Sequence, residues 1–512
     1  MGTLISKTTF IDSRNCIKNT WLKLHKAELL ENFELSEFEK QLIEQGNEVE
    51  ECARKLFPLG VEVTSTGENA CIETARYMES KVPAIFQATF IADGFIARND
   101  VLVYDKNSDC WDLYEIKGTN SLKEGSGDRS HVEDVAFQAV VLRRANVNLG
   151  RSFLVHLNKD YVRVGDLDIE QLFTIEDLTE TVAEKFDEIS ILMDGAKEFL
   201  SQENEPPSGC DCHYLGRSRH CATFPYSHPK IPEYSVHDLS RIGSSKKKLE
   251  FFAENEIYRL EDIPYDFELS PIQTNQLEAY LTQKITIDYE EIHQQLKNLK
   301  FPLYFFDYET YAPAIPSFAN YSPYKRIPFQ FSLHILREPM GELEHVEFLH
   351  PTRTDPSELV AKLINEYIKP EGTIIAWNKS FEIGVNNEIA QRLPEYRELL
   401  ERVNGQFYDL MEVFSKQHYI HPDFRGSASI KKVLPVLVPE LQYKDLAIHE
   451  GGQASEQWWF MVSPTTSEEN YAEVSRNLKE YCKLDTYAMY AIWKHLYQIT
   501  EYLSKISEGN IG

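Results

Sequence analysis

Two carboxylates interrupt an apolar, aromatic stretch of this 512-residue chain. The stretch FPLYFFDYET, residues 301–310, has the composition of a buried strand, yet it carries Asp307 and Glu309. Residues i and i+2 of a strand point to the same side, so these two side chains are expected to lie together. Buried carboxylates repel each other and lose hydration unless a cation such as Mg²⁺ or Mn²⁺ binds them. The stretch therefore predicts a metal site, and the alternative is a strand that has ended and is turning polar.

Length and charge limit the classes of protein that fit. A chain of this length is expected to form two to four domains, and 42% hydrophobic residues support ordinary globular cores. The net charge of -28 argues against a generally basic nucleic-acid surface, although a local basic channel can coexist with acidic outer faces. No apolar run is long enough to span a bilayer, and the first residues lack the pattern of a secretory signal. We expect a cytoplasmic protein without a membrane partner.

The first part of the chain carries a second group of acids. Alternating apolar residues predict strands over residues 84–90, 94–104 and 111–118, and Asp100 lies in the second of them. Glu115 and Lys117 share one face of the third strand. A metal-binding carboxylate pair with an ammonium group beside it suits phosphodiester hydrolysis. Glu50, on a helix before these strands, would by itself be a solvated charge.

Three cysteines follow this region within twelve residues. Cys210, Cys212 and Cys221 come after a Pro-Pro break, and such clustering in a chain with few cysteines indicates ligation of a metal or cluster. Because His213 and His220 lie between them, a zinc site is one alternative. Three free surface cysteines are another.

The last part of the chain offers partners for the acids of residues 301–310. Glu382 follows a predicted buried strand over residues 373–378, and Asp409 is a further acid downstream. Tyr481 and Asp485 are spaced i, i+4 on a long C-terminal helix, so they share a face.

The first group of acids resembles the PD-(D/E)xK nuclease core of the RecB type. The resemblance rests on Glu50, Asp100, the Glu115-Ile116-Lys117 triplet and Gln138, which lies on one helix face with Asp134. It implies that Glu50, Asp100 and Glu115 bind Mg²⁺ or Mn²⁺ and that Lys117 and Gln138 act in catalysis. Many relatives have His at the position of Glu50. Asp93 is the rival of Asp100 for its role.

Nucleases of this group often hold a four-iron four-sulfur cluster with one cysteine near the N-terminus and three after the core. Cys16, Cys210, Cys212 and Cys221 match that placement, so the resemblance implies such a cluster, with zinc as the alternative. The spacing C-x-C-x8-C differs from the commoner C-x2-C-x5-C.

The last part of the chain resembles DnaQ-like exonucleases of the DEDDy type, which have an RNase H-like fold. The three motifs are Asp307-x-Glu309, Asn378-x-x-Phe381-Glu382 and Tyr481-x-x-x-Asp485. The resemblance implies that Asp307, Glu309, Glu382 and Asp485 bind the metal ions and that Tyr481 orients the attacking water. Glu382 stands where Asp is usual.

Taken together, the chain resembles an uncharacterised bacterial family that fuses these two nucleases. The expected α/β organisation is a restriction-endonuclease-like domain over residues 1–225, a helical connector over 226–298 and the exonuclease domain over 299–512. The expected activity is metal-dependent hydrolysis of nucleic acid, DNA rather than RNA, in repair or phage defence. The alternatives are a protein with one active centre and a nucleic-acid-binding scaffold with decayed sites. Nothing in the sequence indicates a protein partner.

Overall fold

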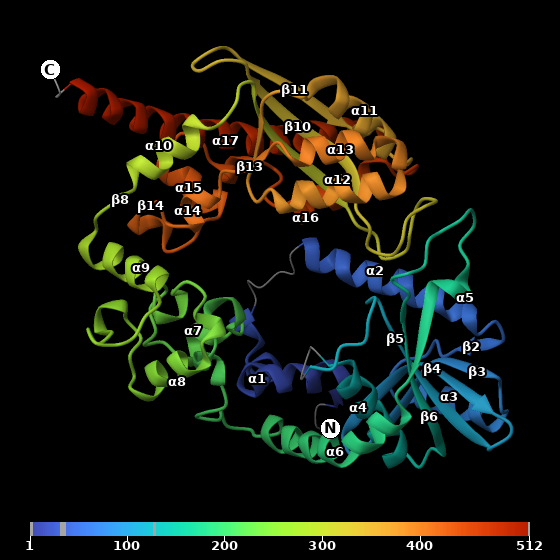
Figure 1. Cartoon of the computed structure of the whole chain (residues 1–512). Coiled ribbons are helices and arrows are strands. Elements are labelled where there is room, and N and C mark those ends of the chain that lie inside the picture. Colours follow the sequence, from blue (N-terminus) through green and yellow to red (C-terminus); the bar gives the residue numbers. More distant parts are fainter. Residues whose placement is uncertain (1–3, 31–36, 126–129, 510–512) are drawn as a thin grey trace. The chain divides into compact units, whose positions relative to one another are not determined.

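The structure is a computed structural model, and it describes residues 4–30, 37–125 and 130–509. The chain forms two compact units. The first comprises Met1–Pro229 and Pro313–Tyr324, and the second comprises Lys230–Ala312 and Lys325–Gly512. Both units contain a sheet with helices, which confirms the expected mixed α/β class (Figure 1). Within the described residues, no helix has the length and apolar character needed to cross a membrane.

A seven-stranded sheet forms the centre of the first unit. Its strands follow the order β2-β3-β4-β5-β6-β7, and the short β1 pairs with β4. The β3-β4 and β4-β5 pairs are antiparallel, whereas β5 and β6 are parallel and are joined through helix α4. The strands are β1 (Ile5–Ser6), β2 (Gly60–Glu62), β3 (Ala84–Ala92), β4 (Phe95–Asp105), β5 (Cys110–Lys117), β6 (Leu149–Leu157) and β7 (Phe173–Asp177).

Helices cover both faces of this sheet. On one face α1, α4 and α6 pack over Leu102, Leu113 and Leu154, and on the other α2 packs over Val101 and Ile116. The alternation along β5 sends Leu113 and Ile116 to opposite faces, as the period of a strand requires. The helices are α1 (Lys7–His25), α2 (Glu37–Ala53), α3 (Glu68–Glu79), α4 (His131–Arg144), α5 (Ile169–Leu172), α6 (Thr179–Leu200) and α7 (Phe224–Ser227).

Residues 230–298 form short helices that belong to the second unit. They are α8 (Lys246–Glu254), α9 (Pro271–Thr282) and α10 (Tyr289–Lys297). The start of α9 is fixed by a capping box, in which Ser270 and Gln273 bond each other's backbone N–H, and by Pro271 in the first turn. Strand β8 (Thr286–Ile287) pairs with β14 (Tyr419–Ile420).

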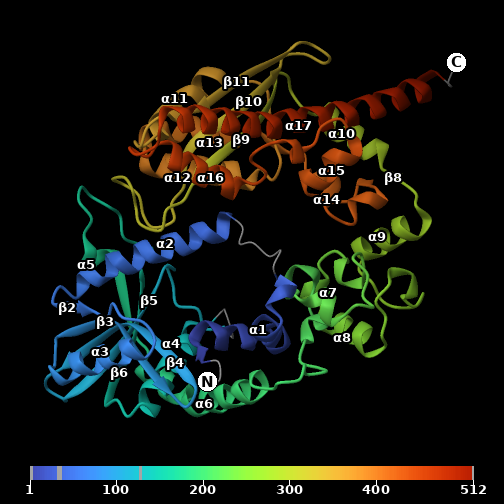
Figure 2. The same ribbon diagram turned by 180° about the vertical axis from the view of Figure 1, so that it is seen from behind.

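The second unit is built on a five-stranded sheet of order β11-β10-β9-β12-β13. Helices α11, α12 and α13 pack on one face, and α16 and α17 lie on the other, as the opposite views of Figures 1 and 2 show. The strands are β9 (Leu303–Tyr311), β10 (Ile327–Leu336), β11 (Leu343–Leu349), β12 (Thr373–Ala376) and β13 (Phe407–Asp409). The helices are α11 (Ser357–Tyr367), α12 (Ser380–Arg392), α13 (Arg397–Asn404), α14 (Glu412–Ser415), α15 (Ile430–Leu437), α16 (Gly451–Met461) and α17 (Glu468–Gly509).

Candidate metal centres

Strand β9 sends its two acids to the face of the second sheet that α17 covers. Its even-numbered residues Tyr304, Phe306 and Tyr308 pack in the core below α11 to α13. Phe305, on the other side, lies edge-on to Tyr490 and Trp493 of α17, with ring centroids 5.6 and 6.0 Å apart. Asp307 and Glu309 have the same parity as Phe305, so they face α17.

Helix α17 brings the third acid to this place. Asp485 accepts a hydrogen bond of 2.6 Å from the hydroxyl of Tyr443, which lies in the loop after α15. The rings of Tyr443 and Tyr481 are 6.4 Å apart, and Tyr481 is buried one turn before Asp485. Two tyrosines therefore adjoin Asp485, whereas the sequence had indicated only Tyr481.

The strand-to-helix turn after β12 places the fourth acid. Asn378 has a left-handed backbone (φ 72°), and the N–H groups of Asn378 and Lys379 donate to the Asp409 carboxylate at 3.0 and 3.2 Å. Asp409 thus fixes the turn from which α12 starts, and these bonds give it a structural role. Glu382, in the first turn of α12, is 2% exposed, and no partner for its Oε2 atom exists among the described residues.

Burial dominates the electrostatics of these acids, and repulsion by neighbouring site acids adds to it at Asp307 and Glu309. Burial, followed by repulsion from Asp485 and Glu309, raises the pKa of Asp307 well above its usual range. Burial likewise raises the pKa of Glu382 to about 8 and that of Asp485 to about 6. The positive charge of Lys431, at the start of α15, acts in the opposite direction on Glu309 and Asp485. Such a set of carboxylates suits Mg²⁺ or Mn²⁺, which would also partner the bare Oε2 atom of Glu382.

A thiol also lies at this centre. The Sγ atom of Cys482, on α17, lies 4.0 Å from the Oδ2 atom of Asp307. Asp307, Glu309 and Cys482 together could hold a metal ion. Burial raises the pKa of Cys482, so the thiol stays protonated without a cation. No pattern in the sequence distinguished this residue.

In the first unit, Asp100 and Glu115 meet where the β4-β5 ladder ends. Val101 pairs with Tyr114, and the next antiparallel positions are Asp100 and Glu115. The N–H group of Ile116 donates to the Asp100 carboxylate at 2.8 Å, so a side chain replaces a strand carbonyl as acceptor. Burial and repulsion from Glu115 raise the pKa of Asp100 to about 8.

Cations and an amide surround Glu115. The Nζ atom of Lys117 lies 2.9 Å from its Oε1 atom, and Gln138 of α4 donates to its other oxygen. Lys117 also pairs with Asp134, while Lys7, the first residue of α1, binds Glu115. Although burial acts in the opposite direction, Lys117 and Lys7 hold the pKa of Glu115 below its usual range. Sequence reasoning missed Lys7, because nothing local ties a lysine near the N-terminus to β5.

Glu50 lies close to these acids but has protein partners. Its Oε1 atom accepts a hydrogen bond of 2.8 Å from Arg54 and another from Gln87 of β3. Its charge contributes to the raised pKa of Asp100, which places the two acids in one electrostatic group. Asp93 lies in the exposed turn between β3 and β4, and its carbonyl accepts from Lys197. The structure therefore joins Asp100, and not Asp93, to Glu115.

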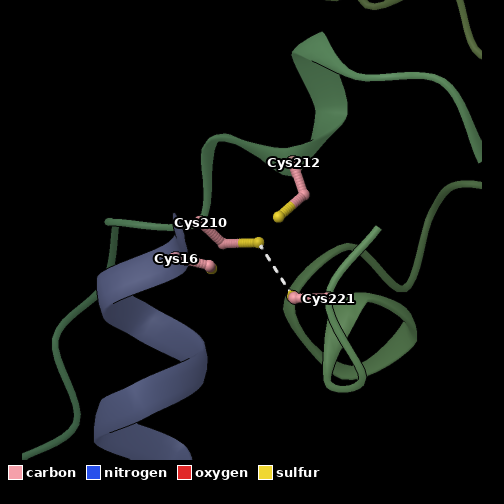
Figure 3. Close-up of side chains that lie close together, drawn as sticks. All are labelled: Cys16, Cys210, Cys212 and Cys221. Carbon is pink, nitrogen blue, oxygen red and sulfur yellow. Dashed lines mark hydrogen bonds between the residues drawn. The ribbon is translucent and has the colours of Figure 1, made fainter. Parts of the chain in front are cut away.

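The four predicted cysteines come together in the first unit (Figure 3). Cys16 projects from α1, Cys210 and Cys212 from the segment after α6, and Cys221 from the following turns. All four Sγ atoms lie within 4.8 Å of one another, and those of Cys210 and Cys221 are 3.7 Å apart. This cluster could hold a metal ion. Since Cys210 and Cys212 are buried, the alternative of free surface cysteines is wrong.

Two backbone irregularities build the cysteine cluster. Cys16 is extended (φ −159°, ψ 101°) inside α1, which kinks the helix there. Gly209 has a φ of 105°, and a Cβ atom on it would lie 2.8 Å from Phe199 and 3.2 Å from Ile17. Glycine thus lets the chain pass close to α1 just before Cys210. The Nδ1 atom of His213 bonds the carbonyl of Cys210 and the Nε2 atom of His220 bonds that of Leu215, and neither histidine belongs to the group of four thiols.

Comparison with known proteins shows that part of the chain is similar to proteins described as uncharacterised. Residues 304–429 match a family described as a domain of unknown function, DUF2779. This segment includes Asp307, Glu309, Glu382 and Asp409 and ends before Tyr443, Tyr481 and Asp485.

Three mycoplasma-type proteins, each named only as uncharacterized, are similar to this chain. The Ureaplasma parvum protein is 26% identical over 238 residues, which cover 42% of this chain and 34% of that protein. Those of Mycoplasma pneumoniae and Mycoplasma genitalium are each 24% identical, over 40% and 42% of this chain and 33% and 35% of their own lengths. The chain spans about a third of the length of these relatives.

Proposed function

We propose that this protein is a metal-dependent nuclease that hydrolyses phosphodiester bonds of nucleic acid, DNA rather than RNA, in repair or phage defence. One observation carries the proposal. Carboxylate oxygens of Asp307 and Glu309 lie within 4.8 Å of each other, and Glu382 and Asp485 act on both electrostatically. Burial raises the pKa of all four acids, and Glu382 leaves one oxygen without a partner in the described chain. Perturbed acids of this kind gather at functional sites. The resemblance to DnaQ-like exonucleases indicates which reaction these acids would catalyse, the hydrolysis of phosphodiester bonds.

In this reaction each residue of the second unit has a distinct task. Asp307, Glu309, Glu382 and Asp485 would hold Mg²⁺ or Mn²⁺, which supplies stabilisation of the attacking and leaving oxygens when bound. Tyr481 orients the water that attacks the phosphorus atom. Tyr443 fixes Asp485 through its hydrogen bond, and Lys431 offers a positive charge to a phosphate oxygen.

The first unit is proposed as a second centre with a PD-(D/E)xK core. Asp100 and Glu115 adjoin at the end of the β4-β5 ladder, and Glu50 stands near them. Lys117, 2.9 Å from Glu115, would orient the attacking water, and Gln138 would hold the other oxygen of Glu115. The two centres would then belong to separate nuclease domains, one in each compact unit.

A protein with activity in the second unit alone is the second candidate. At the first centre protein groups already neutralise the acids, because Lys7 and Lys117 pair with Glu115 and Arg54 pairs with Glu50. A metal ion would have to compete with these cations. Among the described residues, the four acids proposed as metal ligands in the second unit form no ion pair of this kind.

An assay on the 512-residue chain tests both candidates. End-labelled single- and double-stranded DNA and RNA of one sequence would be incubated with Mg²⁺, Mn²⁺ or a chelator. The variants are Asp307→Asn, Lys117→Ala and the pair together, and Glu371→Gln, an exposed acid of the second unit, is the control. We expect each single variant to remove one activity by at least about a hundredfold and the double variant to be inert.

The outcomes separate the candidates. Loss of all cleavage in Asp307→Asn alone, with no effect of Lys117→Ala, would favour one active centre. Cleavage by the double variant at the parental rate would refute the nuclease assignment at these residues.

A further inference from the structure

We propose that Cys16, Cys210, Cys212 and Cys221 hold a single divalent metal ion, zinc, in a tetrahedral site of four thiolates, and not the iron–sulfur cluster that the family resemblance implies. The proposal rests on the separation of the sulfur atoms, on the contacts that fix this separation and on the donor set. It is independent of the proposed nuclease activity.

The separation of the sulfur atoms matches one ion. With metal–sulfur bonds of about 2.3 Å, the ligands of a tetrahedral zinc site lie about 3.8 Å apart. The Cys210 and Cys221 Sγ atoms are 3.7 Å apart, and no pair in the cluster exceeds 4.8 Å. In a four-iron four-sulfur cluster, four irons and four sulfides fill the centre, so the cysteine sulfurs stand about 6 Å apart. All four thiols would have to move outward to admit it.

Contacts on one side of α1 resist that expansion. The N–H group of Lys18 donates to the Gly209 carbonyl at 3.2 Å, and the Lys18 side chain, which is buried, pairs with Glu205 at 2.6 Å. The indole of Trp21 donates to the Gln202 carbonyl at 3.0 Å. These bonds hold the helix that carries Cys16 against the segment that carries Cys210.

The segment with Cys221 is held to the same helix. The Asn19 side-chain oxygen accepts hydrogen bonds from the N–H and the hydroxyl of Thr223, at 3.2 and 2.9 Å. Asn19 also donates its own N–H to the Sγ atom of Cys16 at 3.4 Å, a bond that stabilises a thiolate. The contracted geometry is therefore maintained by groups other than the thiols.

The donor set favours zinc. The group of ligand atoms that lie within 4.8 Å of one another consists of four sulfur atoms and includes no ring nitrogen of His213 or His220. Four thiolates in tetrahedral arrangement are a ligand set of structural zinc sites, and zinc lies above iron(II) in the affinity order of divalent ions. The ion would join α1 to the end of the nuclease-like core, which closes a long loop of the unfolded chain.

Metal and sulfide analysis of the anaerobically purified 512-residue chain tests the proposal. We expect about one zinc per chain, no acid-labile sulfide and a colourless solution. After zinc is removed under reducing conditions, cobalt(II) should bind with about one equivalent and give the absorption of a tetrahedral thiolate site. Cys16→Ser should lose the zinc, whereas Cys71→Ser, at a half-exposed cysteine outside the cluster, should keep it.

Analysis of the parental protein decides the matter even if Cys16→Ser fails to fold. About four irons with matching sulfide in brown protein would overturn the proposal in favour of the cluster. Metal-free protein with a Cys210–Cys221 disulfide would overturn it as well. Neither result bears on Asp307 or Lys117, so the nuclease assignment would stand or fall separately.

Discussion

The acids of the second unit show how the charges of a proposed metal site oppose folding when no metal is bound. Glu382 is buried and Asp307 is half-buried near other carboxylates, and the pKa values of both lie above the usual range. Between the ordinary pKa near 4.5 and the folded value of about 8, the folded protein binds more protons at Glu382 than the unfolded chain does. Stability without metal therefore falls as the pH rises through this window.

We expect Asp307→Asn to stabilise the metal-free protein while it abolishes the proposed activity of the second unit. The amide removes one of the repelling charges, so the unfolding midpoint in chelator at pH 8 should rise by about 2 °C or more. At pH 5 the gain should shrink, because the acids are then protonated. Thermal unfolding at both pH values, with and without Mn²⁺, measures this.

The comparison with Glu371→Gln makes the test specific. That acid is exposed, so its variant should leave the midpoint unchanged at both pH values. An Asp307→Asn midpoint at or below that of the parent at pH 8 would mean that the carboxylates do not repel one another as described.

The two tyrosines at Asp485 allow a second test at this scale. Tyr443 holds Asp485 by a 2.6 Å hydrogen bond, whereas Tyr481 is proposed to orient water. We expect Tyr481→Phe to lower the cleavage rate by about 10²-fold with unchanged Mn²⁺ dependence, as for loss of a catalytic positioning group. Tyr443→Phe should instead raise the Mn²⁺ concentration needed for half-maximal rate. Rates measured across an Mn²⁺ titration distinguish the two, and the reverse pattern would exchange their roles.

At the scale of elements, the periodicity of the sequence located the three central strands of the first sheet. The expected strands over residues 84–90, 94–104 and 111–118 correspond to β3, β4 and β5 within one or two residues. Between β6 and the long helix α6, residues Phe173–Asp177 form strand β7, and α6 begins only at Thr179. The Phe-Thr-Ile-Glu-Asp sequence has β-forming residues, and pairing with β6 decides its state.

The periodicity of the sequence could not predict which distant elements contact one another. The clustering of Cys16 with Cys210 was expected only from the family resemblance, and the kink at Cys16 that permits it has no local signal such as proline or glycine. Lys7 reaches Glu115 because the same helix, α1, begins beside β5. Tyr443 likewise approaches Asp485 through a loop whose path depends on tertiary packing.

Gly209 lies where the chain passes close to α1 and α6, and its replacement gives a third prediction. Gly209→Ala should lower the free energy of unfolding by about 1–3 kcal/mol and weaken metal retention, because its φ of 105° is strained for alanine and the Cβ atom would press on Phe199 and Ile17. Gly165→Ala is the matched control, since Gly165 has a φ of 71° but a Cβ atom there would meet no other atom within 4 Å. Denaturant unfolding with metal analysis measures both. Equal losses in the two variants would show that backbone strain alone, without crowding at α1, accounts for the effect.

At the scale of the whole molecule, residues 313–324 belong to the first unit although they follow β9 of the second. Ala314 and Tyr321 are 1% exposed. The backbones of Arg163 and the segment exchange hydrogen bonds, from Arg163 to Tyr321 at 3.0 Å and from Asn320 to Arg163 at 2.8 Å. Tyr324 donates its hydroxyl to the carbonyl of Gly118, next to Lys117. Sequence order alone assigns this segment to residues 299–512, because chain contiguity carries no information about such an excursion.

A fragment that ends at Pro229 should therefore fold but be less stable than the first unit of the whole chain. A peptide of residues 313–324 should restore part of the lost stability. The peptide restores the buried Ala314 and Tyr321 side chains and the hydrogen bonds to Arg163, so it should bind the folded fragment. At a peptide concentration of a hundred times the dissociation constant, binding adds about 2.7 kcal/mol to the free energy of unfolding, and the unfolding midpoint should rise by several degrees. A peptide with Tyr324→Phe should act more weakly, because it cannot bond the Gly118 carbonyl. A fragment with Arg163→Ala, which loses the side-chain bonds of 2.9 and 3.0 Å to the carbonyls of Pro316 and Ser317, should respond less. Calorimetric unfolding with a scrambled peptide as control measures these shifts, and a fragment whose midpoint ignores the native peptide would show that the segment contributes nothing to the first unit.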